Sequence, residues 1–239
     1  MTTAAPPILM LAAVESTQAI AFELAAQGGP DGAAVVADHQ THGRGRRGRA
    51  WQEEPGTSLL LSVLVRPRLP AAALPGLSFA AALAVADALT ATAGLPATLK
   101  WPNDVRVAGK KIAGILLESR AGDSPPVVVV GVGINLAQQR FPPALAAGAT
   151  SVLLETGRAP ERDAVLRAVL AAFARWRGRL EVDGFAPLRQ RWLALTDTIG
   201  RPVTADGRSG VAIDLGDDGA LLLQDGATVH RIVAGAVEG

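Results

Sequence analysis

A segment rich in arginine and glycine, residues 43–49, constrains this chain more than any other feature. It places four arginines and three glycines within seven residues, and Trp51 follows it closely. Glycine leaves the backbone open and free to turn, while each guanidinium offers planar donors that suit a phosphate or a carboxylate. Because so many like charges repel one another, this arginine loop is predicted to close on an anion. From these residues alone, a solvated basic loop or a patch that touches RNA remains the alternative.

Composition limits the classes of protein to which the chain can belong. The 239 residues are 49% hydrophobic and 19% charged, which suits one sizeable domain, or one domain with a small appendage. The formal net charge is only +1, which argues against a dedicated nucleic-acid coat protein. Cysteine is absent, so disulfides, thiolate metal sites and cysteine nucleophiles are excluded.

The sequence pattern predicts neither a membrane partner nor secretion. We expect the longest apolar stretches to be too short to span a membrane, because Asp, Glu or Arg interrupts them. No basic segment precedes the short apolar stretch near the N-terminus, so we predict no secretory signal. Together with the lack of cysteine, these patterns predict a soluble cytoplasmic protein.

Periodicity predicts an α/β protein with a separate C-terminal part. Strands are expected at residues 8–14, 33–37, 57–65, 98–101 and 127–132, with a hairpin over residues 105–107 and 112–118. Helices are expected from residue 18 onward, with Ser16 or Thr17 as the N-cap, and at residues 78–92 and 164–180. From Thr196 onward, short strands with Gly and Asp turns predict a small β-barrel or meander, so we place a domain boundary between residues 195 and 196.

The glycines of the arginine loop also fit a nucleotide-binding spacing. Gly43, Gly45 and Gly48 match G-x-G-x-x-G, the fingerprint of dinucleotide-binding proteins. The structural context is missing, because a predicted strand instead of a helix follows, and arginines crowd the turn meant for pyrophosphate. No P-loop sequence is present either. Any nucleotide is therefore expected to bind in another way.

Two further segments place polar residues at the ends of predicted strands. Residues 100–104, Lys-Trp-Pro-Asn-Asp, end one strand at a proline turn and present an amide and a carboxylate. We expect a buried Lys111 beside Gly114 to form a slot for a flat ligand with one negative end, against the alternative of an ordinary hairpin with solvated lysines. Residues 131–135 end a buried strand at Asn135. The amide of Asn135 could pair with an adenine edge or cap a turn, and from these residues alone we expect the turn.

Taken in this order, the segments are far more specific than any one of them. The chain resembles the bacterial biotin protein ligases (biotin–acetyl-CoA-carboxylase ligases) over nearly its whole length. The matching stretches are residues 15–17, 39–51, 100–104, 111–118, 131–135 and 235–237. The resemblance implies an α/β (α+β) fold. Residues 1–195 would form a catalytic domain with a mixed sheet flanked by helices, like class II aminoacyl-tRNA and biotin synthetases, and residues 196–239 an SH3-like β-barrel.

The resemblance also implies a reaction. Members of this family activate biotin with ATP and Mg²⁺ to biotinyl-5′-AMP and pyrophosphate, and then transfer the biotinyl group to a lysine. That lysine belongs to a biotin carboxyl carrier protein domain of acetyl-CoA carboxylase or of a related biotin-dependent carboxylase. Biotin and ATP–Mg²⁺ are thus expected as substrates, with no permanently bound cofactor. Because a carboxylate attacks a phosphate, fixed cations and Mg²⁺ must offset the repulsion between two anions.

The roles of single residues are likewise implied by the resemblance. Lys111 would touch the biotin carboxylate and the α-phosphate, Arg46 would retain the intermediate, and Asp104 would lie near the metal and the reacting centre. The expected biotin-binding residues are Ser16, Thr17, Gln40, Gly43, Arg44, Arg46, Lys111 and Gly114. The expected ATP- or adenylate-binding residues are Arg44, Arg47, Arg49, Trp51, Asn103, Lys111 and Asn135. No fixed set of metal ligands is implied, because Mg²⁺ arrives with the phosphates. A core role for Trp51 and a cap or turn role for Asp104 stay open.

The sequence also departs from some members of the family. Some relatives carry an N-terminal winged helix-turn-helix; here the catalytic motifs begin within the first two dozen residues, so we expect no DNA-binding domain. Ala236 stands where an acidic residue is common, which weakens the expected contact between the C-terminus and the nucleotide. A monomer or a weak homodimer is expected. His39 and His42 lack a third ligand nearby, so no structural metal is expected there.

Two alternative functions are open at this point. Lipoate-protein ligase shares the fold superfamily and the adenylation chemistry, but the dense arginine loop and residues 100–104 favour biotin. A nucleic-acid-binding protein would use the arginine loop alone. That class predicts aromatic residues interleaved with basic ones and a global positive charge, whereas this chain has Trp51 alone beside the loop and is nearly neutral.

Overall fold

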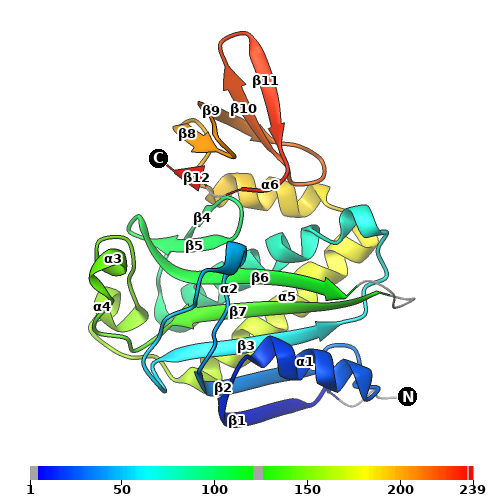
Figure 1. The fold of residues 1–239 in the computed structure, drawn as a ribbon, viewed down its shortest axis with the longest axis vertical. Helices are drawn as coiled ribbons and strands as arrows, with labels where there is room; N and C mark the ends of the chain where they lie inside the picture. Colours follow the sequence, from blue (N-terminus) through cyan, green and yellow to red (C-terminus); the bar gives the residue numbers. More distant parts are fainter. Residues whose placement is uncertain (1–4, 121–125, 236, 239) are drawn as a thin grey trace.

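The computed structural model describes residues 5–120, 126–235 and 237–238, and a seven-stranded mixed sheet lies at its centre (Figure 1). The order of the strands is β1-β2-β3-β7-β6-β5-β4. β1 and β2 are parallel, and every other neighbouring pair is antiparallel. The strands are β1 (Ile8–Val14), β2 (Ala34–Gln40), β3 (Ser58–Val65), β4 (Thr98–Lys100), β5 (Asp104–Val107), β6 (Lys110–Arg120) and β7 (Val127–Asn135). The predicted strands and hairpin are confirmed, with shifted ends.

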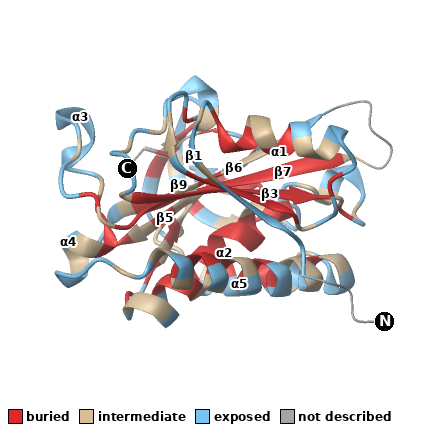
Figure 2. Cartoon of the chain, turned by 90° about the horizontal axis from the view of Figure 1, so that it is seen from below, coloured by how far each residue is buried: buried red, intermediate tan, exposed pale blue. Residues whose placement is uncertain are grey.

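Helices cover both faces of this sheet (Figure 2). α1 (Thr17–Ala26) lies on one face, and α2 (Gly76–Ala93) and α5 (Arg162–Asp183) lie on the other. The helices predicted at these places are confirmed. Three others were not predicted: α3 (Pro143–Ala146), α4 (Val152–Thr156) and α6 (Ala186–Leu195). α3 and α4 are too short to show a helical period, and α6 buries only Leu188 and Trp192.

α2 corrects one expectation drawn from the sequence. The segment Ala71–Ala93 is 23 residues long and apolar enough to cross a membrane, so the prediction that apolar stretches stay short is wrong here. Most of the segment is buried, because α2 packs between the sheet and α5. Its one charged residue, Asp87, accepts hydrogen bonds from the indole N–H of Trp176 (2.8 Å) and from Arg175 (2.7 Å) of α5. The helix is therefore a core element of the fold.

Alternate residues of the central sheet face two separate cores. Val36 and Val130 face α2 and α5, while Val35 and Val129 face α1. α1 covers only part of this face of the sheet. Phe22 of α1 packs against residues of this face that lie near one end of the strands. The remaining part of that face is open, and the candidate site lies there.

The C-terminal residues form a second, five-stranded antiparallel sheet in the order β11-β10-β9-β8-β12. Its strands are β8 (Pro202–Ala205), β9 (Arg208–Leu215), β10 (Leu221–Asp225), β11 (Thr228–Ile232) and β12 (Val237–Glu238). This confirms a small β unit after residue 196. Among the described residues the edge strands β11 and β12 do not pair with each other, so closure into an SH3-like barrel stays a prediction.

Trp101 joins the two sheets. Its ring is buried, and its indole N–H donates to the carbonyl of Gly219, in the turn between β9 and β10 of the C-terminal sheet (3.0 Å). Its backbone N–H donates to the hydroxyl of Thr198 (3.0 Å). Gly219 has a φ of +86°, and a Cβ there would lie 2.6 Å from the ring of Phe79, so only glycine fits this junction. The tryptophan of residues 100–104 thus seats the C-terminal sheet beside the site.

Candidate active site

The open part of the central sheet is the floor of a pocket of about 380 Å³. Leu60, Gly133 and Gly114 lie side by side across β3, β7 and β6 and line this floor. A Cβ on Gly133 would lie 2.7 Å from the indole of Trp51, and a Cβ on Gly114 would lie 3.2 Å from the same ring. The two glycines therefore let the tryptophan lie flat against the sheet, as one wall of the pocket.

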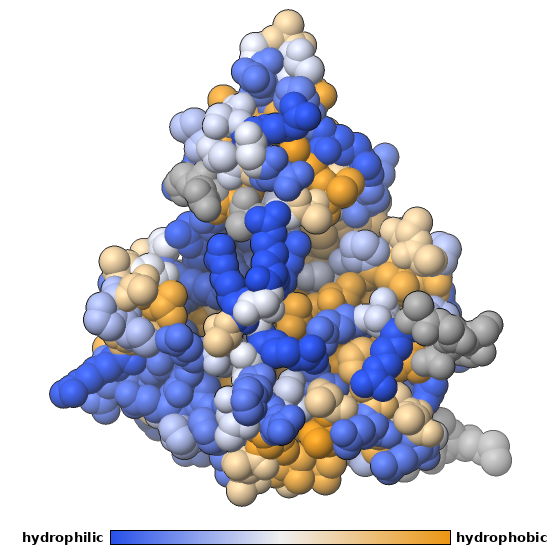
Figure 3. All heavy atoms as spheres, viewed as in Figure 1, coloured by the Kyte–Doolittle hydropathy of each residue, from blue (hydrophilic) through white to orange (hydrophobic). Residues whose placement is uncertain are grey.

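The arginine loop crosses in front of this floor (Figure 1). It forms a small hairpin in which the backbone N–H of Gly45 donates to the carbonyl of Arg49 (2.7 Å) and that of Trp51 donates to Gly43 (2.9 Å). Hydrophilic residues gather at the centre of this face of the molecule, between the main body and the C-terminal sheet (Figure 3). A strand, β3, follows the loop as predicted, in place of the helix that the dinucleotide fingerprint requires.

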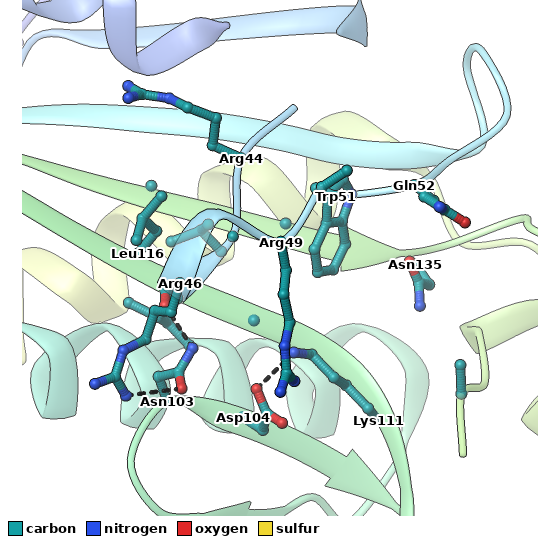
Figure 4. Close-up of a pocket in the computed structure, with 18 of the residues that line it drawn as sticks. Arg44, Arg46, Arg49, Trp51, Gln52, Asn103, Asp104, Lys111, Leu116 and Asn135 are labelled. Carbon is teal, nitrogen blue, oxygen red and sulfur yellow. Dashed lines mark hydrogen bonds and ion pairs between the residues drawn. The ribbon is translucent and has the colours of Figure 1, made fainter. Parts of the chain in front are cut away.

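The four arginines of the loop point in different directions. Arg46 donates to the side-chain oxygen of Asn103 (3.2 Å), and Arg49 extends toward Asp104 and Lys111 (Figure 4). Arg44 extends the other way and pairs with Glu118 (2.8 Å). Arg47, whose φ is +56°, lies 3.6 Å from Asp206 of the C-terminal sheet in an exposed pair.

Lys111 and Asp104 form an ion pair at the mouth of the pocket, with 2.6 Å between Nζ and Oδ1. In the antiparallel pair of β5 and β6, Asp104 lies opposite Gly114, and the side chain of Lys111 passes beside Gly114, which brings the ammonium and carboxylate groups together. The prediction of a buried lysine is wrong, because the side chain of Lys111 is 37% exposed at the rim. The predicted neighbourhood is confirmed, since a Cβ on Gly114 would lie 3.2 Å from Nζ.

Positive charge exceeds negative charge in the pocket. Burial and the nearby charge of Arg47 lower the pKa of the Arg46 guanidinium from its ordinary value, against the opposing effect of Asp104. Within the described part of the chain, Arg49 has no ion pair, and Asp104 is the only carboxylate among the lining residues. A pocket with an excess of positive charge is suited to an anionic ligand.

The inner end of the pocket carries hydrogen-bonding groups. The backbone N–H and the hydroxyl of Thr17 both donate to Oε1 of Gln40 (2.7 and 3.0 Å), and the Thr17 hydroxyl also bonds Ser62 (2.8 Å). Ser16 is the buried N-cap residue of α1, as predicted, but its side chain makes no capping hydrogen bond. The Ser-Thr pair instead faces the pocket.

The family model for biotin/lipoate A/B protein ligases matches residues 10–135 of this sequence.

The chain belongs to this family.

Related proteins and structures extend the match to nearly the whole chain. A biotin–[acetyl-CoA-carboxylase] ligase of Paracoccus denitrificans is 44% identical, over 95% of this chain and 98% of that protein. A bifunctional ligase/repressor of Bacillus spizizenii is 36% identical, over 94% of this chain and 71% of that protein. The structure of a biotin protein ligase from Aquifex aeolicus in complex with biotin and ATP superposes with a TM-score of 0.86, at 30% identity over 97% of both chains.

The fold of this chain brings nearly all of the predicted site residues together. Those that line the pocket are Ser16, Thr17, Gln40, Arg44, Arg46, Arg47, Arg49, Trp51, Asn103, Asp104, Lys111, Gly114 and Asn135. Gly43 lines a second hollow of about 1010 Å³ that shares the arginine loop. Ala236 lies outside the described residues. The position of Arg44, turned toward Glu118, was not predicted.

Three buried polar atoms of the pocket lack a partner within the described part of the chain. They are Nε1 of Trp51, Oδ1 of Asn135 and Oε1 of Gln18. Asn135 ends β7 in a buried position and donates to the carbonyl of Thr150 (3.0 Å), so the turn role expected from its residue type is wrong. Buried polar atoms without partners in a pocket point to hydrogen bonds with a ligand.

Gln18 is the lining residue that the sequence analysis missed. It lies in the first turn of α1, is buried, and donates to the carbonyl of Leu116 (2.8 Å). A Cβ on Gly131 of β7 would lie 2.7 Å from the side-chain nitrogen of Gln18, so the absence of a side chain at Gly131 leaves room for Gln18. The available signal was a polar residue directly after the Ser-Thr pair, on the face of a helix that is otherwise apolar.

The two histidines near the loop hold no metal cluster. Nδ1 of His39 lies 2.7 Å from a carboxylate oxygen of Glu53, and Nδ1 of His42 lies 3.1 Å from the hydroxyl of Thr41. No group of three or more His, Asp or Glu side chains with a metal-binding arrangement occurs among the described residues.

Proposed function

We propose that this chain is a biotin protein ligase, which makes biotinyl-5′-AMP and pyrophosphate from biotin and ATP and then transfers the biotinyl group to a lysine. The observation that carries the proposal is the pocket itself. Lys111, Arg46 and Arg49 surround one end, and the hydrogen-bonding groups of Thr17 and Gln40 lie at the other. An acyl-adenylate has an anionic centre and a polar ring at its end, which fits this arrangement. The relatives named biotin ligases support the assignment.

The first step joins two anions. A carboxylate oxygen of biotin attacks the α-phosphorus of ATP, the new O–P bond forms, and the bond to the bridging oxygen breaks as pyrophosphate leaves. Lys111 and Arg46 offset the repulsion between carboxylate and phosphate, because their charges are held in place before the substrates meet. Asp104 holds the ammonium group of Lys111 at the pocket mouth, and we place it near the Mg²⁺ that enters with ATP.

The two ends of the pocket are assigned to the two halves of the intermediate. Thr17 and Gln40, with Ser16 beside them, would bind the ureido ring of biotin, and the free oxygen of Gln18 suits a ring N–H. Asn135, whose Oδ1 is unpaired, suits the exocyclic amine of adenine. The side-chain oxygen of Asn103 accepts a hydrogen bond from Arg46, and its side-chain nitrogen donates to the carbonyl of Ile115. These bonds favour a role for Asn103 in holding the arginine.

In the second step a lysine amine attacks the acyl carbon. The C–N bond forms, the bond from the acyl carbon to the phosphate oxygen breaks, the amine loses a proton, and AMP leaves. Until then the mixed anhydride must be shielded from water, and the arginine loop above the floor is the element placed to do so. We propose a biotin carboxyl carrier protein domain as the source of the lysine.

The same proposal covers the organisation of the chain. Residues 1–195 would form the ligase domain and residues 196–239 an SH3-like accessory domain that bounds the pocket through Gly235 and Val237. We place the protein in the cytoplasm, as a monomer or a weak homodimer. Trp101 and its bond to Gly219 explain how the smaller unit is held beside the larger one.

Mass spectrometry of the acceptor tests the function and separates biotin from lipoate. The chain is incubated with ATP–Mg²⁺, a biotin carboxyl carrier domain, and either biotin or lipoate. We expect one biotinyl group per carrier with biotin and no addition with lipoate, because the polar inner end of the pocket matches a ureido ring. Addition of lipoate alone would assign the chain to lipoate ligation instead.

A further inference from the structure

Glu53 is a buried carboxylate at the neck of the arginine loop, where the chain leaves β2 and returns to β3. Only 2% of its side chain is exposed. One oxygen, Oε1, lies 2.7 Å from Nδ1 of His39 and accepts from the backbone N–H of Gln40 (3.2 Å). The other oxygen is buried and has no partner in the described part of the chain. Burying a carboxylate with an unpaired oxygen lowers stability, so its position calls for a reason beyond folding.

The carboxylate connects the two legs of the loop. On the outgoing leg it holds the backbone of Gln40, whose side chain accepts both hydrogen bonds from Thr17. On the returning leg it lies two residues after Trp51, which packs against Gly133. Two residues that line the pocket, Gln40 and Trp51, are thus linked through one buried carboxylate.

We propose that Glu53 is a positioning residue for biotin binding, which acts through Gln40 and Trp51. This inference rests on the proposed function. Glu53 is not among the residues that line the pocket, so its effect on a ligand is indirect. Without the carboxylate, the two legs lose one of the contacts that hold them in place, and Gln40 and Trp51 no longer meet the biotin ring at the right distance. Small displacements of positioning groups have large effects on binding and rate.

Steady-state exchange of pyrophosphate into ATP at varied biotin concentration tests the assignment. Glu53→Ala is expected to raise the KM for biotin by about tenfold or more. The kcat at saturating biotin should stay within about threefold of the parent, since bound biotin still meets Lys111 and Arg46. Glu53→Gln keeps an oxygen that accepts from His39 and Gln40, so it should restore the parental KM. Glu54→Ala is the matched control, because the exposed neighbour makes no side-chain contact of this kind.

The possible results separate this inference from the proposed function. A parent chain without biotin-dependent exchange would contradict the function itself. An active parent whose Glu53→Ala variant keeps its KM would overturn the role of Glu53 alone, as would a Glu53→Gln variant that is as impaired as Glu53→Ala. If Glu53→Ala does not fold, judged from its melting curve without ligand, Glu53→Asp decides. It withdraws the oxygens by one methylene, and a raised KM supports the inference while an unchanged KM overturns it.

Discussion

Replacing Lys111 by alanine is expected to lower biotin-dependent exchange between ATP and pyrophosphate by about a thousandfold. The ammonium group is the cation held at the mouth of the pocket, 2.6 Å from Asp104 and beside the glycine floor. Without the ammonium group, less positive charge offsets the repulsion between the biotin carboxylate and the α-phosphate. Asp104 also loses its ion-pair partner and adds a negative charge nearby. Exchange measured with labelled pyrophosphate reports this first step alone, without the carrier.

Lys110→Ala is the matched control for this variant. Lys110 is the exposed neighbour on the same strand, so its removal should leave exchange unchanged. The Lys111–Asp104 pair is partly exposed and contributes at most about 1 kcal/mol to folding, so Lys111→Ala should melt close to the parent. Full exchange by a folded Lys111→Ala variant would remove Lys111 from the reaction.

Replacing Arg46 by glycine is expected to release the intermediate into solution. Arg46 is held over the pocket by Asn103, and burial and the nearby charge of Arg47 lower the pKa of its guanidinium, an effect that an added negative charge would oppose. The phosphate of biotinyl-5′-AMP would supply that charge, and the arginine would retain the intermediate in return. The variant should therefore still form the adenylate but label lysines of bystander proteins, such as added serum albumin, which streptavidin blotting detects.

Arg68→Gly controls for the loss of an arginine as such, since Arg68 is exposed and its side chain makes no contact with the pocket. Bystander labelling by this control should match the parental background. The comparison is made at equal protein concentration and equal adenylate formation. If Arg46→Gly and the parent label bystander proteins equally, the loop does not retain the intermediate through Arg46.

Much of the fold was predictable because its elements carry strong local patterns. β3 and β7 are long apolar runs, and α5 repeats its buried residues every three or four positions from Val165 to Leu180. Short or weakly patterned elements were missed, among them α3, α4 and α6. α2 was predicted as a helix, but the length of its apolar segment was underestimated, because the single charge of Asp87, which is bonded to Trp176, leaves the whole segment apolar on average.

The site was predicted as a set of residues, whereas most of their contacts, apart from that of Lys111 with Gly114, were not predictable. Polar residue types at the strand ends near the loop and in residues 100–104 identify the pocket, and the fold gathers them. Arg44 and Glu118 are 74 positions apart in the sequence, and no local pattern encodes their pairing. The burial of Glu53 and Gln18 is a tertiary property as well, because each looks like a surface residue in sequence.

A crystal structure of the chain with biotin and ATP–Mg²⁺ tests the central claim most directly. We expect an acyl-phosphate group beside Nζ of Lys111, with Arg46 and Arg49 turned toward it and the biotin ring against Thr17 and Gln40. A structure in which the arginine loop points into bulk solvent, with no ligand density beside Lys111, would contradict it.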